Sequence, residues 1–180
     1  CDAGTVTTDL NHIVPITPAV TVSADTDPAC FSVDNVTYTA VPTNGGPTPN
    51  YDWTVNGSLV QSSTSATYSS STVLTGQTVE VTLTSSETCV TTSTAVANTS
   101  ITTAFSPSPV IGDPDQAICE DSPITLNVFT SGGNVQWFEV GSGSLGNTSG
   151  SQTVSTSGSY YAIEDNGFCP PENSDTVTIT

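Results

Sequence analysis

The sequence feature that most constrains the fold is a tryptophan placed between two cysteines, and this arrangement occurs twice. The first copy spans residues 30–89 around Trp53, and the second spans residues 119–169 around Trp137. Each tryptophan lies in a short segment typical of a β-strand, and one large aromatic side chain can fill much of a small core. The repetition therefore predicts two small all-β domains in tandem.

The composition supports two small domains over one large domain. Of the 180 residues, 34% are hydrophobic and 7% are aromatic, which is little for a single large core. Small domains bury a smaller share of their surface and often add a covalent cross-link. The apolar residues are mostly branched or aromatic and are set among Thr and Ser, as in strands, and no stretch repeats them at helical spacing.

Alternating apolar residues mark the strands of the first domain, which we expect to cover residues 20–106. Residues 36–40 alternate with a period of two, and Trp53 lies in a similar stretch before Asn56-Gly57, a strong hairpin signal. The Pro- and Gly-rich residues 42–49 predict a long loop. Tyr51, Trp53 and Val55 are expected to point inward, and Val79, Val81 and Leu83 alternate with polar residues in a later strand. Residues 20–22 are expected to form a short edge strand.

The second domain, expected over residues 107–180, repeats this pattern more compactly. Its strands are indicated by the apolar positions Ile124, Leu126, Val128, Val135, Trp137, Val154, Tyr160, Val177 and Ile179. About seven short strands with turns every 8–12 residues predict a sandwich of the immunoglobulin type. The expected fold class is therefore all-β, with two tandem immunoglobulin-like sandwiches preceded by an extra N-terminal strand.

Residues 1–19 read as the end of another repeat and not as a domain. Cys1 and Cys30 are 29 positions apart, and Cys89 and Cys119 are 30 apart, with similar Thr-rich and Pro-containing stretches between them. Repetition at this scale indicates an array. We expect the extra strand to pair with this chain or with a neighbouring repeat or subunit by strand addition, since an orphan strand must find a sheet. Cys1 would then serve an intermolecular or inter-repeat disulfide, although it also resembles the modified first residue of a lipoprotein.

Two longer motifs resemble a known group of repeats. The motifs are the segment 41–57 together with 74–89, and the second domain's Ile118-Cys119-Glu120-Asp121 together with 158–169. They are similar to the PKD-like and Ig-like repeats of giant secreted surface proteins of Bacteroidota. That resemblance covers nearly the whole chain and implies adhesins or stalks exported by the type IX route. The complete absence of Lys and Arg departs from most such repeats and suggests a specialised polymer or stalk.

Five cysteines without a CxxC motif or a histidine partner indicate disulfides in an oxidising compartment and not zinc. The resemblance and the domain limits favour Cys30–Cys89 and Cys119–Cys169. Each would stabilise its domain by about 3–4 kcal/mol. The rival pairing, Cys1–Cys30 with Cys89–Cys119, fits the spacing equally well but leaves Cys169 alone.

The charge balance excludes several partners. The chain has no Lys or Arg and 17 Asp plus Glu, for a formal net charge of −17. Nucleic acid and anionic membrane surfaces are excluded, since both require cations. No signal peptide or apolar span is visible, so the chain is expected to be a mature extracellular piece that does not insert into a membrane. A surface of one sign keeps copies dispersed, and the lack of Lys and Arg also removes tryptic sites.

Paired acidic residues precede each domain. Asp25 and Asp27 before the first, and Asp113 and Asp115 before the second, could supply oxygen ligands for Ca²⁺ and stiffen an array. Asp-Pro turns are also common for backbone reasons alone, and no EF-type loop occurs. No other cofactor is expected.

No sequence motif indicates an enzyme. His12 is the only histidine and has no suitable nucleophile beside it, and no GxSxG, HExxH or P-loop motif occurs. Nothing marks a carboxylate pair for glycoside hydrolysis. We therefore expect a non-catalytic protein.

Several positions match modification motifs, which occur often by chance in a chain rich in Thr and Ser. Thr176 resembles the acceptor of Bacteroidota O-glycosylation. The N-glycan pattern occurs at Asn35, Asn56, Asn98 and Asn147. The loops 42–50 and 141–150 are candidate recognition loops, although most such loops only connect strands.

The leading hypothesis is a structural or adhesive module of an extracellular surface fibre or filament, whose partners are neighbouring copies or repeats. The alternative is a carbohydrate-binding or other ligand-binding module, with surface glycans as partners and Tyr51, Trp53 or Tyr160 exposed for stacking. A hydrolase accessory domain is a weaker third hypothesis. Burial of the tryptophans would separate the first two hypotheses, because burial removes the stacking platform.

Overall fold

The computed structural model describes residues 14–119 and 122–180, and its secondary structure there consists of β-strands. The chain divides into two compact units, residues 1–103 and 104–180. The division lies three residues before the boundary expected between residues 106 and 107. The described residues form no helix long and apolar enough to cross a membrane.

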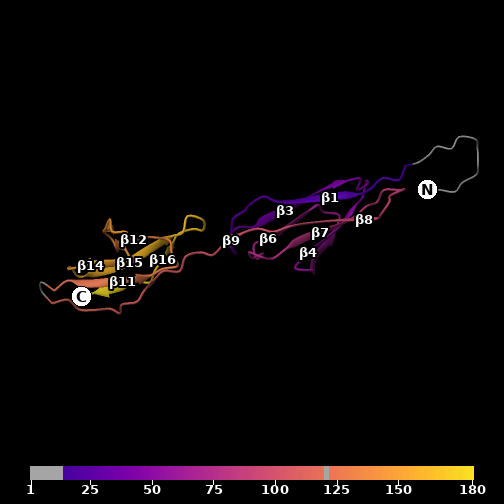
Figure 1. Cartoon of the computed structure of the whole chain (residues 1–180). Helices are drawn as coiled ribbons and strands as arrows, with labels where there is room; N and C mark the ends of the chain where they lie inside the picture. Colours follow the sequence, from indigo (N-terminus) through magenta and orange to yellow (C-terminus); the bar gives the residue numbers. More distant parts are fainter. Residues whose placement is uncertain (1–13, 120–121) are drawn as a thin grey trace, which may run out of the picture. The chain divides into compact units, whose positions relative to one another are not determined.

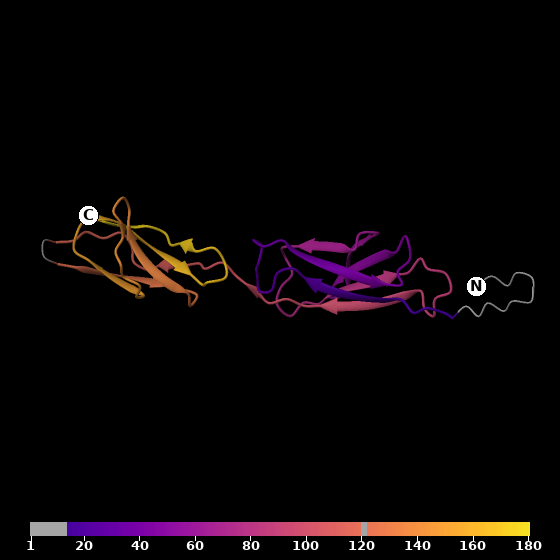
Figure 2. The ribbon, with the colours of Figure 1, turned by 90° about the horizontal axis from the view of Figure 1, so that it is seen from above.

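Unit 1 is built from two antiparallel sheets and a short ribbon (Figures 1 and 2). One sheet has the strand order β1-β3-β6, the other has the order β5-β4-β7-β8, and β2 pairs with β9. The strands are β1 (Ala19–Ala24), β2 (Ala29–Cys30), β3 (Val36–Thr43), β4 (Asn50–Val55), β5 (Ser58–Ser63), β6 (Thr67–Ser70), β7 (Val79–Thr84), β8 (Thr94–Thr99) and β9 (Thr103–Ala104), whose two residues fall on either side of the division.

The core of unit 1 lies between its two larger sheets. Strand β7 shows strict alternation, with Val79, Val81 and Leu83 fully buried, because successive side chains of a strand point to opposite faces. Trp53 is also fully buried, and its ring centroid lies 6.0 Å from that of Tyr68. The predicted inward positions of β4 and β7 are therefore confirmed.

The hairpin between β4 and β5 turns where the sequence predicted it. Asn56 and Gly57 have φ values of 48° and 78°, the left-handed pair that a two-residue type I′ turn requires. The loop prediction for residues 42–49 was partly wrong, because Pro42 belongs to β3 and pairs with Val20. Proline fits there because β6 pairs with β3 only as far as Thr39, so the side of β3 away from β1 is open at Pro42.

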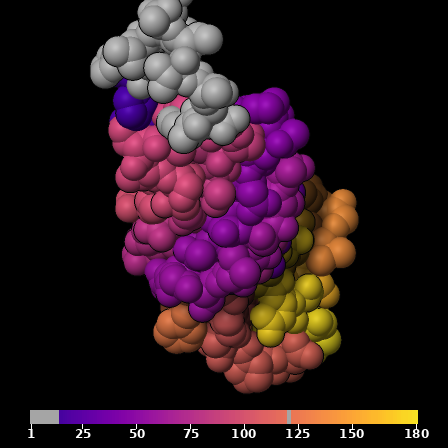
Figure 3. Space-filling view, turned by 90° about the vertical axis from the view of Figure 1, so that its right-hand side faces the viewer, coloured from indigo at the N-terminus to yellow at the C-terminus, as the bar shows by residue number. Residues whose placement is uncertain are grey.

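The rest of that loop is held against the segment after β7. The backbone N–H of Ser86 donates to the carbonyl of Gly45 at 2.9 Å, and the Ser85 hydroxyl donates to the carbonyl of Asn44 at 2.8 Å. A Cβ on Gly46, whose φ is 82°, would lie 2.4 Å from Ser86 Oγ. The space-filling view shows pink atoms from around residues 85–100 directly beside purple atoms from around residues 40–60 (Figure 3). This loop is a braced connection.

The described part of the N-terminal segment pairs within unit 1. Ile16 forms a parallel bridge with Val90, accepts from Thr91 N–H at 2.8 Å, and donates to the Cys89 carbonyl at 3.1 Å. The carbonyl of Thr17 accepts from the Asn44 side chain at 2.8 Å. Residues 1–13, where the prediction of strand addition mainly falls, lie outside the described residues.

Unit 2 has the same two-layer construction. One sheet has the order β10-β11-β14, and the other has the order β13-β12-β15-β16, with β17 also paired to β15. Its strands are β10 (Val110–Ile111), β11 (Ile124–Phe129), β12 (Asn134–Glu139), β13 (Gly143–Ser144), β14 (Ser151–Val154), β15 (Gly158–Asp165), β16 (Glu172–Asn173) and β17 (Val177–Ile179).

Trp137 occupies the centre of the second core as predicted. It is fully buried beside Leu126 and Ala162, and its indole N–H donates to the backbone carbonyl of Ser149 at 2.9 Å. Within residues 14–119 and 122–180, the same N–H of its counterpart Trp53 has no hydrogen-bond partner. Each unit consists of two antiparallel sheets packed around one buried tryptophan. This arrangement confirms the predicted immunoglobulin-like β-sandwich fold.

Candidate functional site

The two acidic residues before Cys30, Asp25 and Asp27, accept hydrogen bonds from backbone N–H groups near strand ends in unit 1. Asp25 Oδ1 accepts from the backbone N–H of Thr37 at 2.9 Å, and Asp27 Oδ1 accepts from that of Thr102 at 2.8 Å. The bond from Thr37 N–H holds the pKa of the Asp25 carboxyl below its ordinary value. These carboxylates therefore satisfy backbone donors where strands begin or end.

The corresponding residues of unit 2 make the same bonds. Asp113 Oδ2 accepts from the backbone N–H of Asn127 at 2.6 Å, and Asp115 Oδ1 accepts from that of Thr178 at 2.7 Å. In both units the first aspartate thus accepts a hydrogen bond from the strand after the cysteine. The second aspartate accepts one from the last segment of the sandwich. The repeat seen in the sequence is also a repeat of hydrogen bonding.

Calcium binding at these aspartates stays a prediction. Each of the four carboxylates already accepts a backbone N–H through one of its oxygens. Among the described residues, no group of three or more His, Cys, Asp or Glu side chains is placed to hold a metal ion. In the structure, the carboxylates of the Asp-x-Asp pairs accept hydrogen bonds from backbone N–H groups, and this role requires no cation.

Three of the four described cysteines are disulfide-bonded, namely Cys30, Cys89 and Cys169. Cys119 is exposed and free. The predicted Cys119–Cys169 bond is therefore wrong, and so is the rival Cys89–Cys119 bond. Cys1 lies outside the described residues.

The separation of the cysteines within each unit explains this correction. In unit 2, Cys119 follows Ile118, which bonds Thr180 near the Gly158 end of β15, whereas Cys169 follows the Asp165 end. Eight strand residues span more than 20 Å, and a disulfide needs Cα atoms within about 7 Å.

The same geometry excludes the predicted Cys30–Cys89 bond in unit 1. Cys89 lies beside Ile16 at one end of β8, whereas Ala29, next to Cys30, bonds Thr102 beyond the other end. The rise along β8 and the residues flanking it again exceeds 20 Å. The two cysteines of each unit, Cys30 and Cys89 in unit 1 and Cys119 and Cys169 in unit 2, therefore lie at opposite ends of their sandwich.

The aromatic residues named as stacking candidates are buried. Tyr51, Trp53 and Tyr160 have 3%, 0% and 2% of their surface exposed, and Trp137 has 0%. Tyr160 also donates its hydroxyl to the Thr156 carbonyl at 2.9 Å. The prediction of a glycan platform at these residues was wrong, because alternation places them on the inner faces of the sheets.

A buried carboxylate holds the turn between β11 and β12. Glu164 is fully buried, and its Oε1 accepts from the Ser131 hydroxyl and from the Gly133 N–H, both at 2.8 Å. Burial raises the pKa of Glu164, but the bonds from Gly133 and Ser131 outweigh burial and hold this pKa below its ordinary value. A Cβ on Gly133 would lie 2.7 Å from the Asp165 carbonyl oxygen, so only glycine fits this turn.

The outer face of strands β12 and β15 carries a surface that the sequence analysis missed. Three cross-strand pairs follow one another along it: Asn134 with Asp165, Gln136 with Ile163, and Phe138 with Tyr161. The rings of the last pair are stacked, with centroids 5.2 Å apart and planes inclined by 16°, and both are half-buried. The alternation of these positions with the buried Val135, Trp137, Tyr160 and Ala162 was the signal that could have revealed them. We call these six residues the β12–β15 face.

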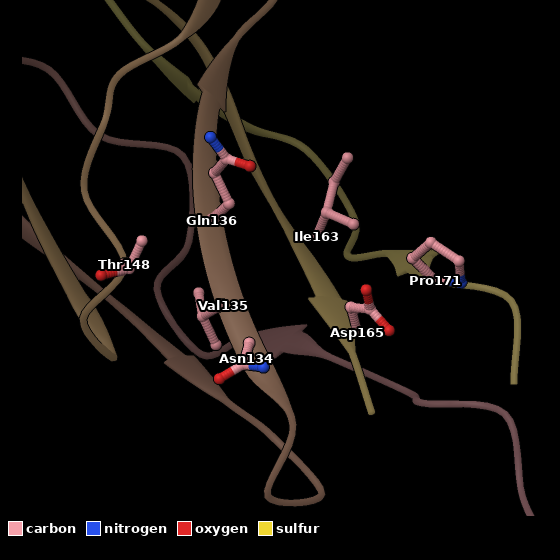
Figure 4. A pocket seen from close by; sticks show the side chains of 7 residues that line it. All are labelled: Asn134, Val135, Gln136, Thr148, Ile163, Asp165 and Pro171. Carbon is pink, nitrogen blue, oxygen red and sulfur yellow. The ribbon is translucent and has the colours of Figure 1, made fainter. Parts of the chain in front are cut away.

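A hollow of about 380 Å³ lies at the Asn134 end of this face (Figure 4). Figure 4 shows Asn134 and Gln136 on one strand and Ile163 and Asp165 on the neighbouring strand, with Pro171 and Thr148 at the sides. The hollow is lined by Asn134, Val135, Gln136, Thr148, Ile163, Asp165 and Pro171. It combines apolar carbon with neutral polar groups and one carboxylate.

The predicted glycosylation positions differ in accessibility. Asn35, Asn56, Asn98 and Thr176 are exposed. Asn147 is half-buried, and its amide donates to the Ser151 carbonyl and to Gln152 Oε1, both at 2.7 Å. Glycosylation at all five stays a prediction, although a glycan on Asn147 would have to displace these bonds. His12 lies outside the described residues.

No protein-family model matches the chain, and a search of curated proteins found no match. Among solved structures, the chain is similar to the N-terminal four Ig domains of Dscam1 isoform 6.9, at 13% identity and a TM-score of 0.45, over 93% of this chain and 46% of that one. It is also similar to the ectodomain (Ig1–Ig3) of mouse nectin-like molecule 4, at 13% identity and a TM-score of 0.44, over 92% and 64%.

A third similarity is to three N-terminal domains of the outer capsid protein Hoc of bacteriophage RB49, at 13% identity and a TM-score of 0.43. It covers 91% of this chain and 58% of that one. The chain thus spans less than two thirds of each of these three structures. Similarities of this size carry no information about ligand or activity.

Proposed function

We propose that this chain is a non-catalytic structural and adhesive module of an extracellular surface fibre or filament. The observation that carries the proposal is the repeated clamp, in which Asp27 and Asp115 bond the N–H groups of Thr102 and Thr178 at matching places in two sandwiches. Repetition of one structural unit along a chain is characteristic of arrays, in which stacked modules set length and stiffness.

The disulfide-bonded cysteines support a location outside the cell or on its surface. Disulfides persist in oxidising compartments, and Cys30, Cys89 and Cys169 are all bonded. A disulfide between two cysteines of one chain also limits how far that chain extends when a sandwich opens. Both properties suit a fibre exposed to shear.

The charge of the chain favours covalently linked repeats over the association of separate copies. With a net charge of −17 and no cation, separate copies repel one another at low ionic strength. Covalent tandem linkage overcomes that repulsion within a chain. Pairing of edge strands between neighbouring copies would then depend on salt, because salt screens repulsion between surface charges. Membership of the PKD-like group from Bacteroidota stays part of this proposal.

Pulling the chain by its two ends tests the load-bearing role. We expect two separate unfolding steps, one for each sandwich, because each unit has its own core. Without cross-links, 180 residues would extend to about 600 Å. The oxidised chain should stop well short of this length, and a reducing agent should restore it. Extension without a resolved unfolding step would contradict the proposal.

Sedimentation velocity tests assembly through strand pairing. We expect the chain to be monomeric in 10 mM salt and to form larger species as salt approaches about 0.5 M, where the Debye length falls to roughly 4 Å. The matched comparison is the same chain without residues 1–13, the segment expected to supply a free strand. If the chain sediments in the same way at both salt concentrations, strand addition is removed from the proposal. The mechanical role would then be tested by the pulling experiment alone.

A further inference from the structure

We propose that the β12–β15 face, together with the hollow at its Asn134 end, binds a neutral oligosaccharide. The inference rests on the proposed adhesive function and names its ligand class. Side chains at every second position of a strand lie about 6.7 Å apart, so Asn134, Gln136 and Phe138 form a strip about 13 Å long. The strip is long enough for a short oligosaccharide and too exposed for a core.

The aromatic end of the strip supplies an apolar platform. Phe138 and Tyr161 are directly opposite on β12 and β15, with their rings 5.2 Å apart and nearly parallel. An aromatic face carries partial negative charge, and the C–H groups on the flat side of a sugar ring are weakly positive. Ile163, half-buried and next along β15, extends the apolar surface toward the hollow.

The other end of the strip supplies hydrogen-bonding groups for hydroxyls. Gln136 uses its amide N–H on Ser144 Oγ at 2.7 Å, which leaves its Oε1 as an acceptor. Oδ1 of Asp165 accepts from Gly167 N–H at 2.8 Å, and Asp165 as a residue is exposed. The side chains of Asn134 and Thr148 are exposed and form no hydrogen bond with the other described residues. A polyol can donate to and accept from this set at once.

Charge decides between ligand classes. The whole chain has no Lys or Arg, so a sulfated, phosphorylated or uronic ligand would meet no cation here and would face Asp165. A purely apolar ligand would leave the amides and the carboxylate unpaired, which costs binding energy. A neutral sugar satisfies both requirements. The hollow of about 380 Å³ is within the usual range for small-ligand sites.

A glycan array carrying neutral and acidic oligosaccharides, followed by calorimetry with the best neutral one, tests the inference on the full chain. We expect binding to neutral members only, with an affinity that changes little between low and high salt. Phe138→Ala and Tyr161→Ala should each weaken binding by about tenfold, as expected for loss of an aromatic contact of about 1.4 kcal/mol. Tyr161→Phe should keep most of the affinity, because it keeps the ring.

The matched control is Phe129→Ala, which removes an aromatic ring of the same unit that is 68% exposed and lies on another sheet. Its affinity should equal that of the unchanged chain. Absence of binding to every neutral glycan, preferred binding of acidic glycans, or an equal loss in Phe129→Ala would each overturn the inference. None of these results would alter the pulling experiment, so failure of the glycan site is distinguishable from failure of the structural role.

Discussion

Oδ1 of Asp115 accepts a hydrogen bond of 2.7 Å from the backbone N–H of Thr178, which joins the segment before Cys119 to the last strand of its sandwich. The two residues are 63 positions apart in the sequence. Asp27 and Thr102 are 75 positions apart and make the same contact at 2.8 Å in unit 1. In each unit, one carboxylate near the start of the sandwich thus bonds the backbone of the segment that ends it.

Removal of this carboxylate should destabilise unit 2. Asp115→Ala leaves the Thr178 N–H without its partner and should lower the free energy of unfolding by about 1 kcal/mol, measured by urea denaturation. Asp115→Asn should cost less, because its amide oxygen can still accept. The control Asp175→Ala removes an equal charge from an exposed residue that makes no side-chain hydrogen bond with the described residues. An equal loss in the control would show that charge, and not the bond, is responsible.

Glu164 should make the stability of unit 2 depend on pH in the acid range. Its pKa is held below the ordinary value of 4.5, so the unfolded chain takes up the proton first as pH falls. Its contribution is therefore present above pH 4.5 and is lost as pH falls through the lower folded-state pKa. Glu164→Gln should cost about 1–3 kcal/mol at pH 7 and progressively less toward pH 2–3, in thermal unfolding followed across pH.

The comparison for that experiment is Glu172→Gln, on the strand paired with β15 opposite Glu164. Glu172 is exposed, so its loss should leave both the stability and its pH dependence nearly unchanged. A parallel decline of the Glu164→Gln variant and the unchanged chain on acidification would argue against a role for the buried carboxylate.

Tyr38 should set an alkaline limit on the stability of unit 1. Burial, followed by the charges of Tyr68, Asp25 and Asp27, raises the pKa of Tyr38 to about 12. Because the unfolded tyrosine ionises near pH 10, folding loses stability as pH rises from about 10 to 12. Tyrosinate absorbance and loss of β-structure in circular dichroism should then rise together across this range.

Tyr38→Phe provides the variant for this test. The Tyr38 hydroxyl is buried and has no hydrogen-bond partner in the part of the chain that the structure describes. Its removal should therefore leave the stability at pH 7 unchanged or raise it by up to about 1 kcal/mol. The alkaline transition should move to higher pH. A large loss of stability at pH 7 would instead reveal a partner for the hydroxyl.

The cysteines should divide into two groups on replacement by serine. Cys30→Ser breaks a disulfide and should cost about 2–4 kcal/mol, whereas Cys119→Ser should change the unfolding free energy by less than about 0.5 kcal/mol. In the native state, Cys119→Ser should also remove one equivalent of thiol that reacts with a coloured disulfide reagent. A stability loss in Cys119→Ser equal to that in Cys30→Ser, or an unchanged thiol count, would contradict the assignment.

Local chemistry was readable from the sequence where a single residue or a short alternation decides the structure. Asn56-Gly57 forms the expected turn because few other pairs adopt two left-handed conformations in succession. The inward tryptophans followed from period-two alternation with neighbouring polar residues. The repeated Asp-x-Asp pairs were also visible, but their backbone partners 63 and 75 positions away were not.

The sequence by itself therefore determined the all-β class, the two aromatic cores, the tandem repeat and the absence of cations. Tertiary structure alone decided that Cys30 and Cys89 lie at opposite ends of a sandwich, that Cys119 is free, and that Phe138 meets Tyr161 on an outer face. The physical reason is that alternation specifies which side of a strand a residue occupies. Which strands become neighbours, in which register, depends on how the whole core packs.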